Sequence, residues 1–248
     1  MRIYLLMVLL TISSFALAEE KTDSNIPAAV TEALKKFAKV DISKIKLSTT
    51  PIPGLYEAMI GSEIVYISAD GNYLIMGDIR DLKTGKNIAD SKFSKLRLKA
   101  LNSLNVRDMV VFAPENGTKH VVHIFTDVDC PYCAKIHKEV PTLNKAGIEV
   151  RYLAFPRAGI GSGTYNDMVS VWCAKDRQQA MTDAKEGKEI EKAECNNPVA
   201  DQYKLGQSIG INGTPALILS DGELIPGYLP AQRLINYINQ KSSPFSAK

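Results

Sequence analysis

Apolar and polar residues repeat with a helical period near the start of the chain and then with a strand period. Ile26, Val30, Leu34 and Phe37 fall on one face of a helix predicted over residues 24–40. Alternating runs follow, separated by Gly-Ser and Asp-Gly-Asn, which are typical of turns between antiparallel strands. The predicted strands cover residues 45–49, 55–60, 64–68 and 73–79. A unit of about 60 residues is marginally stable alone, so we expect it to bury surface against a second copy of the chain.

A charged helix and a second series of elements follow this unit. Residues 90–104 have a helical apolar stripe that lysines and an arginine interrupt, which favours a connecting helix over a core helix. The order after it is strand, strand, helix, strand, helical insert, strand, strand, helix. A strand–helix–strand order predicts parallel pairing through a right-handed crossover. The predicted strands are residues 106–112, 120–125, 148–155, 214–219 and 223–226, and the predicted helices after Gly147 are residues 165–175, 176–186, 198–207 and 230–240.

Two cysteines, Cys130 and Cys133, stand where the strand over residues 120–125 ends and a helix begins. A sulfur at a helix N-terminus faces unpaired N–H groups and the positive end of the helix dipole. Both stabilise a thiolate, which is the nucleophilic form of cysteine. Pro131 suits the first helical position because it lacks an N–H, and Pro141 is expected to kink the same helix. The pattern predicts a redox dithiol in which Cys130 attacks, while Cys133 is more buried and less acidic.

The first residues are typical of a cleavable export signal. Arg2 precedes an apolar run over residues 3–12, and Ala16-Leu17-Ala18 has the spacing of a cleavage site. We therefore expect a signal peptide over residues 1–18 and export to an oxidising compartment.

Composition, charge and cysteine count narrow the chemistry. The formal charge of +3 and the lack of a dense basic cluster argue against binding to nucleic acid. Four cysteines in an exported chain predict two disulfides, one within the close pair and a structural one between Cys173 and Cys195. Because those two are 22 positions apart, they do not form a second C-x-x-C motif, and no metal site or cofactor is expected. We expect His123 to pack within its strand and His137 to lie at the surface.

Thr214-Pro215 opens the strand that follows the helical insert. The order of elements, with the cysteine pair at a strand–helix junction, predicts a thioredoxin fold, and in thioredoxin-like proteins the matching proline follows a cis peptide beside the dithiol. This resemblance implies that the Thr214 backbone lies next to Cys130 and pairs with an extended substrate segment. With Pro215, and with the expected exposure of Tyr132, it implies a substrate-binding surface around the dithiol.

The whole chain after the export signal resembles the periplasmic DsbC/DsbG family of disulfide isomerases. The motifs that carry the resemblance are Phe125-Thr126-Asp127, the spacing of Cys173 and Cys195, Gly213-Thr214-Pro215-Ala216-Leu217 and Pro226-Gly227-Tyr228. The family commonly has Gly-Tyr between its cysteines, where this chain has Pro131-Tyr132, and these middle residues tune the redox potential. The resemblance implies a homodimer joined through its N-terminal units. It also implies a periplasmic location and a membrane reductase of the DsbD type that keeps the dithiol reduced.

The expected organisation is α/β, with a thioredoxin-like catalytic domain that carries a helical insert and a small α+β dimerisation domain. The expected boundaries are a signal peptide over 1–18, the dimerisation domain over 19–86, a linker helix over 87–105 and the catalytic domain over 106–248. The expected function is isomerisation and reduction of non-native disulfides in secreted proteins, together with chaperone activity. The alternatives are a DsbG-like reductase of sulfenylated cysteines, a net oxidase, and a holdase chaperone without chemistry.

Overall fold

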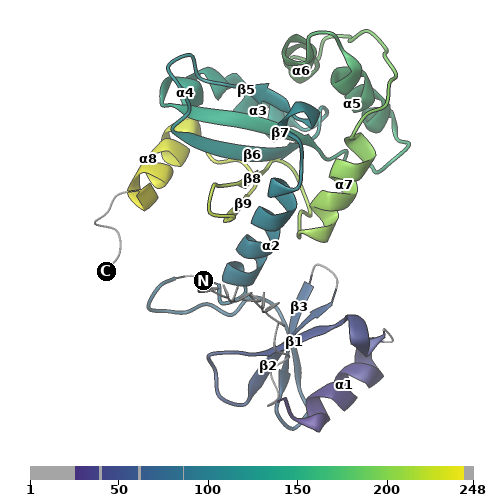
Figure 1. The fold of residues 1–248 in the computed structure, drawn as a ribbon, viewed down its shortest axis with the longest axis vertical. Helices are drawn as coiled ribbons and strands as arrows, with labels where there is room; N and C mark the ends of the chain where they lie inside the picture. Colours follow the sequence, from purple (N-terminus) through teal and green to yellow (C-terminus); the bar gives the residue numbers. More distant parts are fainter. Residues whose placement is uncertain (1–25, 39–40, 61–62, 86, 243–248) are drawn as a thin grey trace, which may run out of the picture. The chain divides into compact units, whose positions relative to one another are not determined.

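A computed structural model describes residues 26–38, 41–60, 63–85 and 87–242, and the chain divides into two compact units (Figure 1). The first unit takes the described residues up to Ala58 together with Tyr66–Ile75, and the second takes Met59–Val65 and the chain from Met76 onwards. The signal peptide expected over residues 1–18 lies outside the described residues. In the part of the chain that is described, no helix has the length and apolar character needed to cross a membrane.

The N-terminal elements are a helix, a short 3-10 turn and a meander of strands. Val30 and Leu34 are buried on one face of the helix, as its apolar spacing predicts. Gly71, in the turn before the last strand, has φ +71°, and a Cβ there would lie 2.6 Å from the carbonyl oxygen of Ala29. The elements are α1 (Ala28–Ala38), η1 (Ile42–Lys44), β1 (Lys46–Thr49), β2 (Leu55–Ile60), β3 (Glu63–Ser68) and β4 (Leu74–Met76). The strands form one sheet in the order β1-β2-β3-β4, so β4 is an edge strand.

The charged helix α2 (Asp90–Asn102) is anchored to the second unit. Arg97 is buried, and its guanidinium donates hydrogen bonds to the carbonyl oxygens of Ile209 at 3.3 Å and Gly222 at 3.4 Å. The contact is close, because a Cβ on Gly222 would lie 2.2 Å from the carbonyl oxygen of Ser94. A buried arginine is tolerated here because carbonyl acceptors replace water around its N–H groups. The charge pattern that suggested a connecting helix did not predict this packing.

The second unit is built on a five-stranded sheet in the order β5-β7-β6-β8-β9. β6 and β7 pair in parallel, as the strand–helix–strand order predicts, and the other neighbours are antiparallel. The prediction of a strand over residues 106–112 was wrong in its first half: Val106–Asp108 forms a 3-10 turn (η2), because the Asn105 side chain accepts a hydrogen bond from the Arg107 N–H. The strands are β5 (Val110–Phe112), β6 (His120–Thr126), β7 (Ile148–Ala154), β8 (Ala216–Ile218) and β9 (Leu224–Pro226).

Helices cover this sheet, and α5, α6 and α7 gather beside one end of it (Figure 1). Successive side chains of β6 point to opposite faces. Ile124 therefore joins a core cluster with α3, α4, α5 and α8, while Phe125 joins a second cluster that includes residues of α2. The helix after the cysteine pair breaks at Glu139, near Pro141. The helices are α3 (Pro131–Lys138), α4 (Val140–Lys145), α5 (Gly163–Cys173), α6 (Arg177–Lys185), α7 (Val199–Ser208) and α8 (Ala231–Ser242).

Candidate functional site

The cysteine pair lies at the junction between β6 and α3. Cys130 is the N-cap of α3 in an extended conformation, and its sulfur accepts a hydrogen bond from the Cys133 N–H at 3.4 Å. Pro131 occupies the first helical turn, where its missing N–H leaves no carbonyl unpaired. Both cysteines are free thiols, and both are buried. The local sequence therefore places one sulfur at the positive end of a helix, with the second one turn inside it.

The two sulfurs have opposite acid–base properties. The hydrogen bond with the Cys133 side chain lowers the pKa of Cys130 to about 5, with further lowering by Thr214, by the Cys133 N–H and by the charge of Arg157, against an opposing effect of burial. Burial raises the pKa of Cys133 far above that of an ordinary thiol, and the hydrogen bond with Cys130 raises it further. At neutral pH, Cys130 is a thiolate and Cys133 keeps its proton. These are the acid–base properties expected of an attacking thiol and a resolving thiol.

Thr214 faces the Cys130 sulfur from the strand side. The Thr214–Pro215 peptide bond is cis, and the Cys130 thiol, when protonated, donates to the Thr214 carbonyl oxygen at 3.3 Å. The Thr214 hydroxyl is buried and has no hydrogen-bond partner within the described residues in this form of the site. It nevertheless contributes to the lowered pKa of Cys130, because a thiolate offers that hydroxyl an acceptor. Thr214 therefore lies against the Cys130 sulfur through its carbonyl oxygen, and its side chain favours the thiolate form.

An ion pair between the buried Asp127 and the half-exposed Arg157 supports the loop before Cys130, and it was not predicted from the sequence. Asp127 is 2% exposed, and one carboxylate oxygen accepts the Asp129 N–H at 2.8 Å. The other oxygen accepts the backbone N–H of Arg157 at 2.8 Å and its Nε at 3.0 Å. Arg157 follows β7, and parallel strands such as β6 and β7 end at the same edge of a sheet. The position of Arg157 just after a strand parallel to β6 could therefore have predicted that it lies near the cysteine pair.

Aromatic side chains form an exposed surface next to the dithiol. Tyr132, between the two cysteines, is 59% exposed and stacks on Tyr228 with ring centroids 6.3 Å apart. The Lys135 ammonium lies 4.6 Å from the Tyr228 ring centroid, which is within range of a cation–π contact. Tyr132 and the Pro226-Gly227-Tyr228 motif lie far apart in the sequence, and the fold brings the rings of Tyr132 and Tyr228 together.

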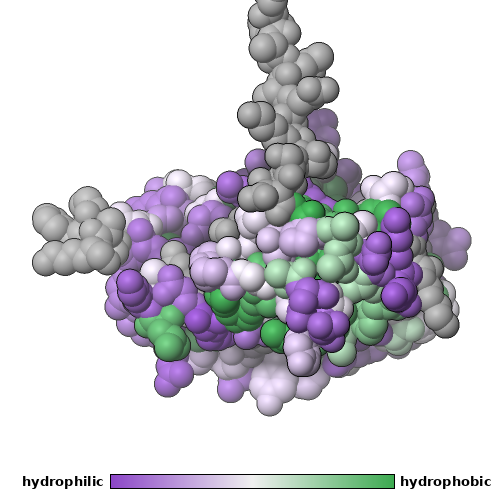
Figure 2. Space-filling view, turned by 90° about the horizontal axis from the view of Figure 1, so that it is seen from below, coloured by the Kyte–Doolittle hydropathy of each residue, from purple (hydrophilic) through white to green (hydrophobic). Residues whose placement is uncertain are grey.

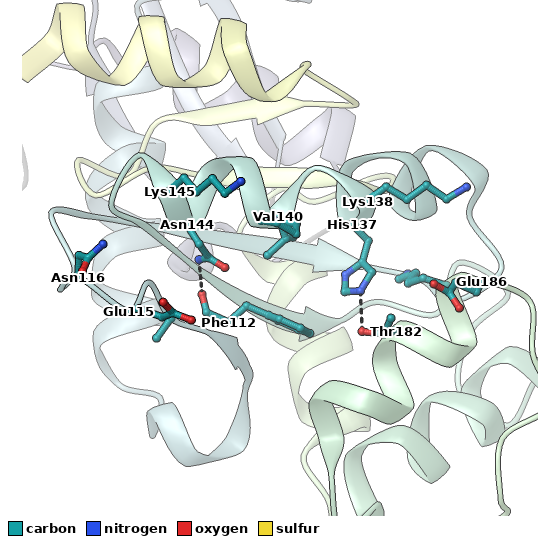
Figure 3. A pocket seen from close by; sticks show the side chains of 13 residues that line it. Phe112, Glu115, Asn116, His137, Lys138, Val140, Asn144, Lys145, Thr182 and Glu186 are labelled. Atoms are coloured by element: carbon teal, nitrogen blue, oxygen red, sulfur yellow. Dashed lines mark hydrogen bonds between the residues drawn. The ribbon is translucent and has the colours of Figure 1, made fainter.

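The remaining predicted residues lie away from this surface or behind it. Cys173 and Cys195 form a disulfide with a Cα–Cα distance of 5.7 Å, which ties the end of α5 to the segment before α7. The expectation that His137 lies at the surface was wrong, because α6 covers this side of α3. Its ring nitrogens bond the Tyr152 hydroxyl at 3.0 Å and the Thr182 hydroxyl at 3.1 Å, and Figure 3 shows the bond to Thr182. Burial lowers the pKa of His137 to about 4.

No cluster of three or more His, Cys, Asp or Glu side chains within the described ranges is arranged to hold a metal ion. The chemistry available at the site is that of sulfur. A thioredoxin fold with a helix-capping thiolate and a buried partner thiol defines a thiol–disulfide oxidoreductase. Residues 106–242 match a family model described as a thioredoxin-like domain, and residues 16–90 match one described as the disulfide bond isomerase protein N-terminal domain.

Curated relatives place the chain more narrowly. It is 36% identical over 241 residues to the thiol:disulfide interchange protein DsbC of Escherichia coli (strain K12), which covers 97% of this chain and 96% of that protein. It is 37% identical over 213 residues to the protein of the same name from Haemophilus influenzae, with coverage of 86% and 90%. The chain belongs to the thiol:disulfide interchange protein DsbC family. A solved disulfide interchange protein from Neisseria gonorrhoeae is 30% identical, over 56% of this chain and 97% of that one, with a TM-score of 0.49. The predictions of a thioredoxin-like α/β fold and of disulfide-exchange chemistry are confirmed.

Proposed function

We propose that this protein isomerises and reduces non-native disulfides in exported proteins, with Cys130 as the nucleophile and Cys133 as the resolving thiol. The observation that carries the proposal is the geometry at the start of α3, where the Cys130 sulfur caps the helix and accepts the Cys133 N–H at 3.4 Å while Cys133 is fully buried. This geometry goes with a lowered pKa of Cys130 and a raised pKa of Cys133. A thiolate poised beside a thiol that stays protonated attacks a client first and closes the internal disulfide only later. The protein exchanges disulfides instead of storing its own.

The electrons balance in two ways. The Cys130 thiolate attacks a client disulfide, a mixed disulfide forms, and one client sulfur leaves as a thiolate. If a second client thiolate then attacks the mixed disulfide, Cys130 is released and the client is rearranged without net electron transfer. If Cys133 attacks Cys130 instead, the client leaves with two thiols and the enzyme holds a Cys130–Cys133 disulfide. That second route consumes two electrons, which a membrane reductase of the DsbD type is proposed to return.

Thr214, Pro215 and Tyr132 are proposed to bind the client. Support comes from the Thr214 carbonyl at 3.3 Å from the Cys130 sulfur and from the exposed Tyr132–Tyr228 stack. The exposed main-chain groups of a strand edge can form hydrogen bonds with the main chain of an extended client segment. Flat aromatic rings can pack against many different apolar side chains. Such a surface suits an enzyme whose clients share a wrong disulfide but no sequence.

A homodimer joined through residues 19–86 is proposed, with residues 87–105 as linker and residues 106–248 as catalytic domain. Support comes from the edge strand β4, where Tyr73, just before it, is 70% exposed and Met76 is also 70% exposed. Hydrophobic side chains also reach the surface on the face shown in Figure 2. Light scattering tests the dimer: Ile75→Lys, on β4, should produce a monomer, and Ile160→Lys, at an equally exposed isoleucine outside β4, should not. A monomeric unmodified protein would contradict the proposal.

A periplasmic location is proposed from the export pattern over residues 1–18 and from the Cys173–Cys195 disulfide, which is typical of an oxidising compartment. The dithiol must nevertheless be kept reduced to start an attack, which is why a dedicated reductase is part of the proposal. Alkylation of living cells followed by mass spectrometry would report the state of each cysteine. We expect Cys173 and Cys195 oxidised while Cys130 and Cys133 are reduced.

Refolding of a scrambled, multi-disulfide ribonuclease tests the main proposal. The unmodified protein should restore ribonuclease activity, Cys130→Ser should not, and Cys133→Ser should accumulate mixed disulfides. Reduction of a sulfenylated cysteine without any isomerisation would favour the sulfenic-acid reductase instead. Chaperone activity is tested separately, because a Cys130→Ser/Cys133→Ser variant should still suppress aggregation of an unfolded client.

A further inference from the structure

A buried lysine stands behind the dithiol, and the exchange mechanism above does not use it. Lys185 is the last residue of α6 and is 5% exposed. Its ammonium donates to the Thr126 hydroxyl at 2.8 Å and to the Asp127 carbonyl oxygen at 2.6 Å. Both acceptors belong to the end of β6 and the loop that leads to Cys130. Burying a lysine is costly unless its charge is used or removed, so this placement calls for a function.

The Thr126 hydroxyl links Lys185 to the resolving thiol. Thr126 is fully buried, accepts the hydrogen bond from Lys185, and also interacts through its side chain with the Cys133 sulfur, where it favours the thiolate. The three polar groups therefore form a chain from amine to hydroxyl to sulfur. The titratable and charged groups that face this chain are Cys130, Asp127 and Asp129 from the strand–helix junction, His137 from α3, Tyr152 from β7, Arg157 from the loop after β7 and Glu186 from the end of α6.

The charge balance at this spot makes proton exchange possible near neutral pH. Burial lowers the pKa of Lys185 to about 8, although the nearby Cys133 and Asp127 oppose the shift. A fraction of the lysine is therefore a neutral amine at working pH, whereas Cys133 is a neutral thiol. A neutral amine beside a neutral thiol can accept its proton, and the resulting ammonium stabilises the thiolate that it leaves.

We propose that Lys185 accepts, through the Thr126 hydroxyl, the proton that Cys133 must lose before it attacks the mixed disulfide at Cys130. This inference rests on the proposed function. In the step, Thr126 passes its hydroxyl proton to the Lys185 amine and takes the Cys133 proton. The Cys133 thiolate forms a bond to the Cys130 sulfur, the bond between Cys130 and the client breaks, and the client sulfur leaves as a thiolate. That thiolate takes up a proton from water, and Lys185 returns one to water, so the net reaction reduces the client by two electrons.

A cavity supplies the route to water. Lys185 lines a cavity of about 560 Å³ that also holds His137 and Thr182, with the exposed residues Glu115 and Lys138 at its rim. Figure 3 shows His137 and Thr182 meeting in this cavity between α3 and α6. The cavity brings solvent to the side of Lys185, while Cys133 itself stays buried. Protons leave the resolving thiol by a path separate from the face where the client binds to Cys130.

A stopped-flow reaction with dithiobis-nitrobenzoate separates the two sulfurs. Cys130 releases one nitrothiobenzoate when it attacks, and Cys133 releases the second when it resolves the mixed disulfide. In the unmodified protein the second phase should accelerate with pH up to about 8 and then level off, following Lys185. In Lys185→Met the second phase should slow at pH 7 by roughly 100-fold or more and keep rising to higher pH, as expected for loss of a general base. The first phase should change little.

Two further variants make the result decisive. Thr126→Val removes the linking hydroxyl and should reproduce the slow second phase, including in the event that Lys185→Met does not fold. Lys188→Met removes an exposed lysine near the end of α6 and should leave both phases unchanged. A second phase with an unaltered rate and pH profile in Lys185→Met and in Thr126→Val overturns the inference. A missing first phase in the unmodified protein would contradict the proposed function instead, so the two failures are distinguishable.

Discussion

The pH dependence of alkylation tests the acid–base asymmetry of the dithiol most directly. With a pKa of about 5, Cys130 is roughly 99% thiolate at pH 7, whereas a thiol at the ordinary value of 9.0 is roughly 1% thiolate. Reaction of Cys130 with iodoacetamide should therefore reach half its plateau rate near pH 5 and be independent of pH above about 7. Cys133, whose pKa is raised, should react negligibly over the same range.

The magnitudes also decide what the low pKa of Cys130 does. The pKa of Cys130, about 5, lies about 4 below the ordinary thiol value of 9.0. Because the nucleophilicity of a thiolate falls with its pKa, a Cys130 thiolate is roughly 40- to 100-fold less reactive than an ordinary cysteine thiolate. At pH 7 this nearly cancels the roughly 100-fold gain in thiolate population. The main effect of the low pKa is on Cys130 as a leaving group, because a sulfur of low pKa leaves a mixed disulfide faster. Cys130 is therefore tuned to be released by a client thiol or by Cys133, which is what isomerisation requires.

The assay is mass spectrometry of the reduced protein after timed alkylation at each pH, with every cysteine followed separately. Cys173 and Cys195 remain joined and serve as an internal control, since they should not react. A midpoint for Cys130 above pH 7, or equal rates for Cys130 and Cys133, would refute the reasoning.

The lowered pKa also links folding to pH in the reduced protein. Because the folded pKa of about 5 lies below the ordinary value of 9.0, Cys130 stabilises the fold fully above pH 9, and this contribution is lost as pH falls through 5. The reduced protein should gain unfolding free energy across this window relative to Cys130→Ser, at no more than about 1.4 kcal/mol per pH unit. A flat difference between the two proteins, measured by urea denaturation, would contradict the shift.

Three further experiments probe the residues that support the site. Replacing Cys173 and Cys195 by serine opens a loop of 22 positions and should lower the free energy of unfolding by about 3 kcal/mol, read from urea midpoints. Gly206→Ala should destabilise by about 1–3 kcal/mol, because its Cβ would lie 2.7 Å from a buried phenylalanine ring, whereas Gly163→Ala meets no atom within 4 Å and should be neutral. Arg157→Met leaves a buried carboxylate without its cation, which should cost about 1–2 kcal/mol of unfolding free energy and raise the alkylation midpoint of the attacking thiol. An unchanged midpoint would show that the arginine charge does not reach the sulfur.

Local features of the sequence determined the site. A strand period that ends at Phe125, a proline at the first helical turn and a cysteine before it are enough to place Cys130 at a helix N-terminus, because capping depends on neighbours in the chain. The parallel pairing of β6 with β7 followed from the order of elements. The motif around Thr214 was recognised by resemblance, and its contact with Cys130 joins residues 84 positions apart.

Only the tertiary structure decided the environment behind the sulfurs. Lys185 reaches Thr126 across 59 positions, and His137 reaches Thr182 across 45. Nothing in the local pattern of α6 distinguishes Lys185 from the exposed lysines around it, because burial of a helix face depends on which element packs against it. Hydrophobic periodicity predicts which apolar residues are buried, but it does not predict which polar residues are buried with them. The sequence therefore determined which sulfur caps the helix, and the packing of α6 against α3 decided which groups surround the buried sulfur of Cys133.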